Sequence, residues 1–158
     1  MTTRSFPRAK REAACASLLA AASLWLAAPA EAALGDTAAP IAAATTRGLA
    51  GGTARVVGYV DAGGTTINEY VAVATGQIFA YSWRGPTMPN LDALLGSYAA
   101  SWRSGAAAVL DEARGDLHAA RVDQPDVVVE TAGQMRSYVG RAWLPAALPA
   151  GVSEGDLR

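Results

Sequence analysis

The chain has 158 residues, of which 51% are hydrophobic, with 13 basic and 14 acidic side chains. Its one cysteine cannot form a disulfide framework, so hydrophobic burial must hold the fold together. A mildly acidic surface without clustered Lys and Arg excludes nucleic acid as a partner, because binding to phosphates depends on such clusters.

The N-terminus has the pattern of a secretory signal peptide. A basic head at residues 4–11 precedes an apolar run, Ala13–Ala28, and Ala30-Glu31-Ala32 then places small residues where a signal peptidase reads them. An uncleaved membrane anchor is the alternative, but the run is shorter than the roughly 20 apolar residues that a spanning helix needs. We therefore predict a signal peptide over residues 1–32, cleavage between Ala32 and Ala33, and a periplasmic or secreted protein.

Removal of this segment takes four basic and two acidic residues with it, which leaves nine against twelve. The remaining chain has no lysine and no cysteine, and its length fits a single domain. No second apolar segment approaches membrane-spanning length, so we expect no membrane span after signal removal.

Residues 33–52 are dominated by Ala, Thr and Gly and offer few large apolar side chains, so we predict a flexible leader in which residues 38–46 could form a short helix. Alternating apolar residues and glycine-containing turns then predict three strands. The third carries aromatic residues at every second position. These strands cover residues 53–61, 65–74 and 78–83.

A helix is predicted after the third strand, because Gly85-Pro86 and Met88-Pro89 must end the strand and apolar residues then recur at helical spacing from Leu91 to Leu110. Thr87 or Asn90 could cap the helix, and Arg114-Gly115 would stop it. Glycines in its middle favour a kink or two shorter helices; they are Gly96 and Gly105.

Three more strands are predicted after the helix, at residues 119–123, 127–131 and 135–143, with turns at residues 124–126 and 132–134. A Pro-rich segment follows and should cross the body in extended form. We thus predict one α+β domain over residues 53–158. It would be an antiparallel sheet of about five to six strands with one central helix on a face, in the order strand-strand-strand-helix-strand-strand-strand.

No motif for catalysis, a cofactor or a metal withstands inspection, so we expect a protein that is not an enzyme. Gly151-Val152-Ser153-Glu154-Gly155 has the spacing of a nucleophile elbow, but the only histidine, His118, precedes it. One imidazole without a thiolate is also a poor metal donor set. Five acids have no known calcium-loop spacing and are better explained as a solvated face. They are Asp111, Glu112, Asp116, Asp123 and Asp126.

The segment Trp83–Pro89 is the best candidate for a contact surface, because a two-proline loop with an arginine, a methionine and a neighbouring tryptophan is typical of protein-contact anchors. The competing interpretation is structural: Trp83 and Met88 fill the gap between sheet and helix, and Trp143 lies in the core. The candidate interaction surface consists of Trp83, Arg84, Met88, Tyr98 and Trp143.

Four segments, between Gly58 and Ser153, resemble the proteobacterial domain of unknown function 2844. Two positions depart from that pattern: Asn90 stands where an acid is usual, and Ala99 stands where an aromatic is usual. The resemblance therefore does not predict the helix cap or the packing contact at these two positions. The resemblance implies export but no activity, and so no catalytic residues. The segments are Trp83-Arg84-Gly85-Pro86-Thr87-Met88-Pro89, Leu94-Leu95-Gly96-Ser97-Tyr98, Ala142-Trp143-Leu144-Pro145 and Leu148-Pro149-Ala150-Gly151-Val152.

From these observations we expect an exported, non-enzymatic module that binds another envelope or secreted protein. The alternative is a small-ligand carrier or an atypical hydrolase that uses the aromatic strand face as a pocket. No cofactor is expected for either.

Overall fold

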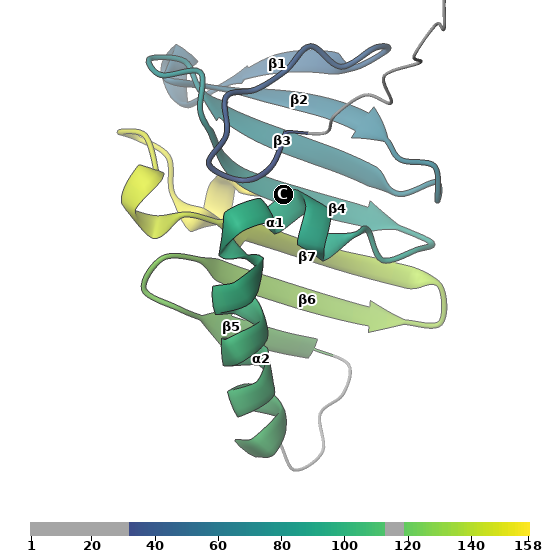
Figure 1. Ribbon diagram of the computed structural model, residues 1–158. Helices are drawn as coiled ribbons and strands as arrows, with labels where there is room; N and C mark the ends of the chain where they lie inside the picture. The colour runs from purple at the N-terminus through teal and green to yellow at the C-terminus, as the bar shows by residue number, and fades with distance from the viewer. Residues whose placement is uncertain (1–31, 113–118) are drawn as a thin grey trace, which may run out of the picture.

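A computed structural model describes residues 32–112 and 119–158 and shows one antiparallel sheet with helices on one face (Figure 1). The described strands lie in the order β1-β2-β3-β4-β7-β6-β5. The predicted signal peptide lies outside the described residues, apart from Ala32. The strands are β1 (Thr45–Leu49), β2 (Ala54–Val60), β3 (Thr66–Ala72), β4 (Ile78–Gly85), β5 (Ala119–Asp123), β6 (Val128–Gln134) and β7 (Ser137–Trp143).

The two faces of the sheet are covered differently. Helices α1 (Leu91–Leu95) and α2 (Ala99–Glu112) cover one face together with residues 33–44, which we call the N-terminal strap. Residues 145–158, the C-terminal segment, lie on the opposite face, where Leu157 is 2% exposed against a second apolar cluster. The predicted α+β class is therefore confirmed, with a layer on each side of the sheet. In the described part of the chain no helix is long and apolar enough to cross a membrane.

The described sheet has seven strands rather than five to six, because part of the predicted flexible leader forms β1. This strand pairs with β2 from Thr45↔Gly58 to Leu49↔Ala54. Its side chains are mostly exposed, so it lacks the alternation of polar and apolar residues that marks a strand. The turn that joins β1 to β2 has positive φ at Ala50, Gly51 and Gly52. The order is thus four strands, the helical part and three strands.

The helical region begins and breaks as the sequence predicts. Asn90 is the N-cap, and its side chain accepts a hydrogen bond of 3.2 Å from the amide of Ala93. Gly96 has a φ of +54° and separates α1 from a 3-10 turn and α2, which confirms the expected break. Ala99, the other departure from the family pattern, is buried. The predicted stop at Arg114-Gly115 lies outside the described residues.

The hairpin between β6 and β7 turns later than predicted. Its turn lies at Met135 and Arg136, both with positive φ, whereas residues 132–134 belong to β6. Gly133 lies in β6 opposite Tyr138 of β7. This strand position needs a glycine, because a Cβ there would lie 2.6 Å from the ring of Tyr138. The glycine thus makes room for an aromatic ring across the strands, and the shift resets the pairing of β6 with β7.

Candidate functional site

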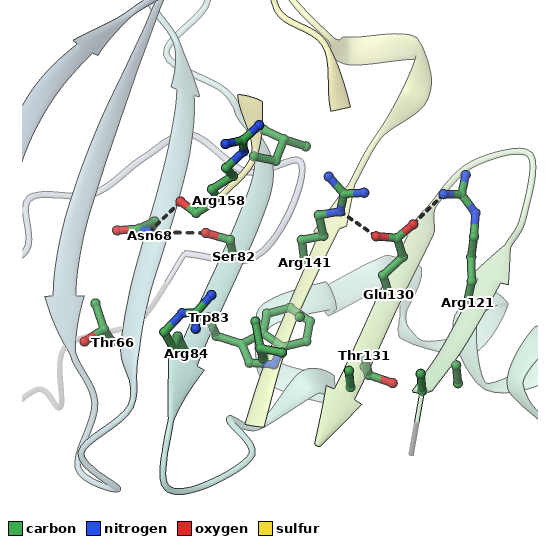
Figure 2. Close-up of a pocket in the computed structure, with 16 residues that line it drawn as sticks. Thr66, Asn68, Ser82, Trp83, Arg84, Arg121, Glu130, Thr131, Arg141 and Arg158 are labelled. Carbon is green, nitrogen blue, oxygen red and sulfur yellow. Dashed lines mark hydrogen bonds and ion pairs between the residues drawn. The ribbon is translucent and has the colours of Figure 1, made fainter. Parts of the chain in front are cut away.

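The face of the sheet opposite the helices holds a trough of about 800 Å³. It extends from β3 across β4, β7 and β6 to β5, and the end of the C-terminal segment forms one wall (Figure 2). Its size is that of a small-molecule site. The lining residues that carry the argument are Arg84, Arg121, Glu130, Arg141, Leu157 and Arg158.

The trough is hollow because small side chains occupy this face where the strands leave the C-terminal segment. Ala119, Ala132 and Val139 line it, whereas Tyr70 and Trp143 fill the neighbouring part of the same face together with Leu157. The large side chains form an apolar core on one half of this face, and the small side chains leave an open depression on the other half. The trough therefore has an apolar floor, and the charged side chains lie at its rim.

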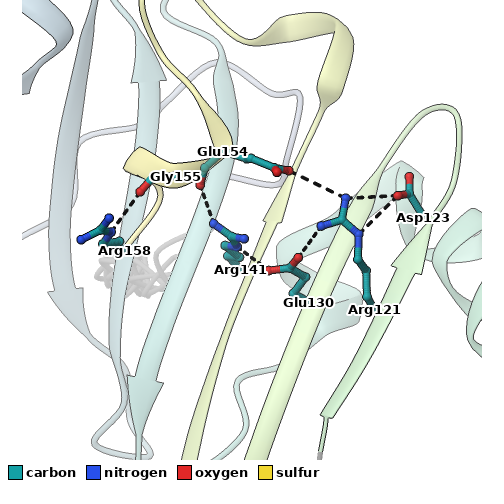
Figure 3. Close-up of polar contacts among 7 residues, drawn as sticks. All are labelled: Arg121, Asp123, Glu130, Arg141, Glu154, Gly155 and Arg158. Carbon is teal, nitrogen blue, oxygen red and sulfur yellow. Dashed lines mark hydrogen bonds and ion pairs between the residues drawn. The ribbon is translucent and has the colours of Figure 1, made fainter.

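Three neighbouring strands align an arginine, a glutamate and an arginine across the trough. Glu130 pairs in register with Arg121 on β5 and with Arg141 on β7. Its carboxylate accepts hydrogen bonds of 2.5 Å from both guanidinium groups (Figure 3). We call this cluster the Arg-Glu-Arg ladder. Because cross-strand neighbours on one face lie within side-chain reach, the register alone brings these charges together.

The ladder is fixed from two further sides. The guanidinium carbons of Arg121 and Arg141 lie 5.4 and 5.1 Å from the ring of Trp143, within the range of cation–π attraction. The main-chain carbonyl of Glu154, in the C-terminal segment, accepts a hydrogen bond from Arg141. The Glu154 carboxylate lies 3.7 Å from the guanidinium group of Arg121. Both arginines are therefore held in place without a ligand.

Glu130 remains ionised well into the acid range. The hydrogen bond from Arg141 is the main cause that lowers the pKa of Glu130, burial opposes it, and Arg121 adds to the lowering. One carboxylate thus serves two arginines within the ladder. Asp123 and Glu154 place two more acids beside Arg121, so the positive charges of the ladder are largely balanced by neighbouring carboxylates.

Arg84 and Arg158 add two further positive charges to the same trough. Arg158 donates from Nε to the Gly155 carbonyl at 3.0 Å. Among the described residues, no acid pairs with Arg84, which is exposed on β4. The described lining therefore contains four arginines and one acid, a side-chain charge of +3 in a chain whose formal charge is −1. Counting Asp123 and Glu154, which pair with Arg121 from outside the lining, reduces this charge to +1.

The predicted interaction residues do not form one surface. Trp83 and Trp143 are each 2% exposed and belong to the two different apolar clusters, one on each side of the sheet. Tyr98 is partly buried against the N-terminal strap. Met88 is 41% exposed, and Arg84 and Trp83 both line the trough. Both tryptophans are therefore packed in the interior, as the structural interpretation of the sequence expected.

The motifs that the sequence discounted have ordinary roles where they are described. Ser153 donates from its hydroxyl to Asp156 at 2.7 Å and caps a short 3-10 turn. Asp123 pairs with Arg121, and Asp126 accepts a hydrogen bond from Ser101 at 2.7 Å. Within residues 32–112 and 119–158, no group of three or more His, Cys, Asp or Glu side chains could hold a metal ion. His118 lies outside these residues.

Sequence reasoning found Arg84 but missed the Arg-Glu-Arg ladder. The signal was present, because Glu130 and Arg141 are charged residues in otherwise apolar or small-residue strands. Placing the turn at residues 132–134 moved this pair out of register, however, and hid their proximity. The C-terminal wall offered no pattern at all, since Leu157 follows a segment without periodicity.

Comparison with known proteins identifies the chain at the level of its family. The family model described as Protein of unknown function (DUF2844) matches residues 30–157. No curated protein and no solved structure matches the chain. The match covers most of the chain and includes the strap, the sheet and the trough, and the protein therefore belongs to the DUF2844 family.

Proposed function

We propose that this protein is an exported, non-enzymatic binding module of the cell envelope and that its trough takes a small organic anion with an apolar body. The observation that carries the proposal is the charge of the lining, four arginines to one acid. Charged groups of one sign in a hollow of low polarity concentrate ligands of the opposite sign. The apolar lower wall favours a ligand with a hydrocarbon or aromatic part.

A small ligand is favoured over a protein partner for a geometric reason. Two of the side chains expected to anchor a partner, Trp83 and Trp143, are buried. On β4, Tyr81 and Trp83 belong to the apolar cluster under the helical layer, and only Trp83 is also among the residues that line the trough. The binding role therefore moves to the opposite face. Export is inferred from the signal-peptide pattern and from the family resemblance.

Arg84 is the residue expected to make the first contact with the anion. Within the described part of the chain it has no acid partner to displace, whereas Arg121 and Arg141 are already engaged by Glu130. A hydrogen bond to a charged group contributes about 1.5–3 kcal/mol. Loss of the Arg84 guanidinium should therefore weaken binding about tenfold or more.

The test uses two fluorescent probes that share one aromatic body. 8-Anilinonaphthalene-1-sulfonate carries a negative charge, and N-phenyl-1-naphthylamine lacks it. The full-length protein should bind the sulfonate at one saturable site and the neutral probe at least about tenfold more weakly. Arg84→Gln should weaken sulfonate binding about tenfold.

The matched control is Arg47→Gln, an exposed arginine on β1 at the far side of the sheet, which makes the same change in net charge. It should leave sulfonate affinity within about twofold, because screening limits exposed charges to a Debye length of about 10 Å. Equal affinities of the two variants, or equal affinities of the two probes, would show that the trough is not the site.

A further inference from the structure

The N-terminal strap enters the core at its first residues. Leu34 is 1% exposed, and its amide donates to the Leu94 carbonyl at 2.8 Å. The amide of Gly35 donates to the Ile78 carbonyl at 2.9 Å, so the strap is bound to α1 on one side and to β4 on the other. The chain is therefore part of the packed body directly after the predicted cleavage point.

Ala33 itself has a fixed position. A Cβ on Gly96, at the end of α1, would lie 2.5 Å from the Cβ of Ala33, so this glycine is what makes room for the strap. The backbone nitrogen of Ala33 lies 3.1 Å from Oδ2 of Asp36. A carboxylate thus stands beside the nitrogen that cleavage would convert into an amino terminus.

A buried carboxyl group lies on the other side of the same peptide unit. Glu69 is 1% exposed, and its Oε1 has no hydrogen-bond partner among the described residues. Its Oε2 lies 3.2 Å from the Tyr81 hydroxyl, which also hydrogen-bonds to the Ala32 carbonyl. Glu69, Tyr81 and the Ala32–Ala33 peptide therefore form a continuous chain of polar contacts.

The Tyr81 hydroxyl has one hydrogen and two acceptors, the Ala32 carbonyl and Glu69, while the peptide bond is intact. When this hydrogen points to the Ala32 carbonyl, Glu69 keeps its hydrogen bond to Tyr81 only if it is protonated and donates to the Tyr81 oxygen. This agrees with burial, which raises the pKa of Glu69 against the opposing effects of Tyr81 and Arg55.

We propose that removal of the leader between Ala32 and Ala33 leaves the new Ala33 ammonium half-buried against the fold, bonded to Asp36 and Tyr81, and that it completes the polar network of Glu69. A processing peptidase and one water break the C–N bond. The carbonyl carbon of Ala32 takes the hydroxyl and leaves with the leader, and the nitrogen takes the hydrogen and then a proton from solvent.

The hydrogen-bond chain then reverses. With the Ala32 carbonyl gone, the ammonium donates to the Tyr81 oxygen, and Tyr81 turns its hydrogen to Glu69. Glu69 gives its proton to solvent and becomes a carboxylate. Processing would thus replace a neutral buried acid by a paired one, so the mature chain has a network that the precursor lacks. This inference rests on the export part of the proposed function and is independent of the trough.

The test starts from the full chain produced in an exporting bacterial host. Mass spectrometry of the processed protein should give Ala33 as its first residue. The precursor for comparison is Ala30→Arg, which disrupts the small-residue pattern before the cut and leaves every described residue unchanged. NMR of carboxyl-labelled glutamate at pH 7 should show Glu69 neutral in the precursor and ionised in the processed protein.

The processed protein should also have an α-amino pKa at least about one unit above the usual value near 8, a tenfold shift in its protonation equilibrium. Asp36→Asn should reduce this shift, and Asp36→Asn with Glu69→Gln should abolish it. Exposed Glu154 is the internal control and should ionise alike in both forms. Processing at another bond, or the same ionisation of Glu69 in both forms, would overturn the proposal, and neither result would bear on ligand binding in the trough.

Discussion

Gly140 lies at the centre of the sheet, where Trp83 of β4 crosses β7, and its replacement by alanine is the sharpest test of this packing. A Cβ at Gly140 would lie 2.3 Å from Cζ2 of Trp83 and 2.4 Å from the carbonyl oxygen of Glu130. The second contact is with backbone and cannot be relieved by a side-chain rotation. Overpacking of this kind costs typically 1–3 kcal/mol.

The steric cost of Gly140→Ala is about 3 kcal/mol, at the upper end of that range, because the added methyl group meets both an indole and a main-chain oxygen. Entropy works the other way, since alanine in place of glycine normally gains about 0.4–1 kcal/mol through the unfolded chain. The net loss of stability is therefore about 2–2.6 kcal/mol, or about 30- to 80-fold in the unfolding equilibrium constant. Urea denaturation followed by tryptophan fluorescence measures it.

Gly48→Ala is the matched control for this experiment. Gly48 also lies in a strand, β1, and a Cβ there would meet no atom within 4 Å. The same chemical change should therefore leave the free energy of unfolding unchanged or raise it by up to about 1 kcal/mol, the gain from the unfolded chain. If Gly140→Ala were as harmless as Gly48→Ala, the close crossing of Trp83 over β7 would be wrong.

Three further substitutions test other parts of the structure. Leu157→Ala should cost about 2–5 kcal/mol in the same urea assay, because it empties a buried site under the C-terminal segment; a loss below about 1 kcal/mol would mean that this segment does not cover the sheet. Asn90→Ala should lower stability by about 1 kcal/mol through loss of the N-cap, and unchanged stability would argue against the bond to Ala93. Glu130→Gln should be less stable than the parent at pH 7. Because the folded-state pKa of Glu130 is lowered, its contribution is present above its ordinary pKa near 4.5 and is lost as the pH falls through the folded value, so the gap should narrow by pH 3; a gap independent of pH would contradict the ladder.

The elements that sequence reasoning predicted are those with local signals. The proline-containing loop ended β4, Asn90 supplied a cap, and Gly96 divided the helical region, each through the chemistry of one or two adjacent residues. Strand β1 was missed because its threonines face solvent and give no periodic pattern. Local chemistry thus predicted boundaries better than it predicted the number of strands.

The candidate site was less predictable because it depends on pairing between distant segments. Arg121, Glu130 and Arg141 meet only when the β6–β7 turn is placed at Met135 and Arg136. An error of two residues in a turn changes which side chains face each other across the strands. One wall of the trough comes from the C-terminal segment, whose course over the sheet is fixed by tertiary contacts alone.

The most direct test of the trough as a ligand site is an NMR titration of the labelled full-length protein with 8-anilinonaphthalene-1-sulfonate. Saturable shifts are expected at the amides of β4, β6 and β7 and at Nε of Arg84, with little change in β1 on the far side of the sheet. Shifts spread evenly over both faces, or confined to the helical face, would contradict a binding site in the arginine-lined trough.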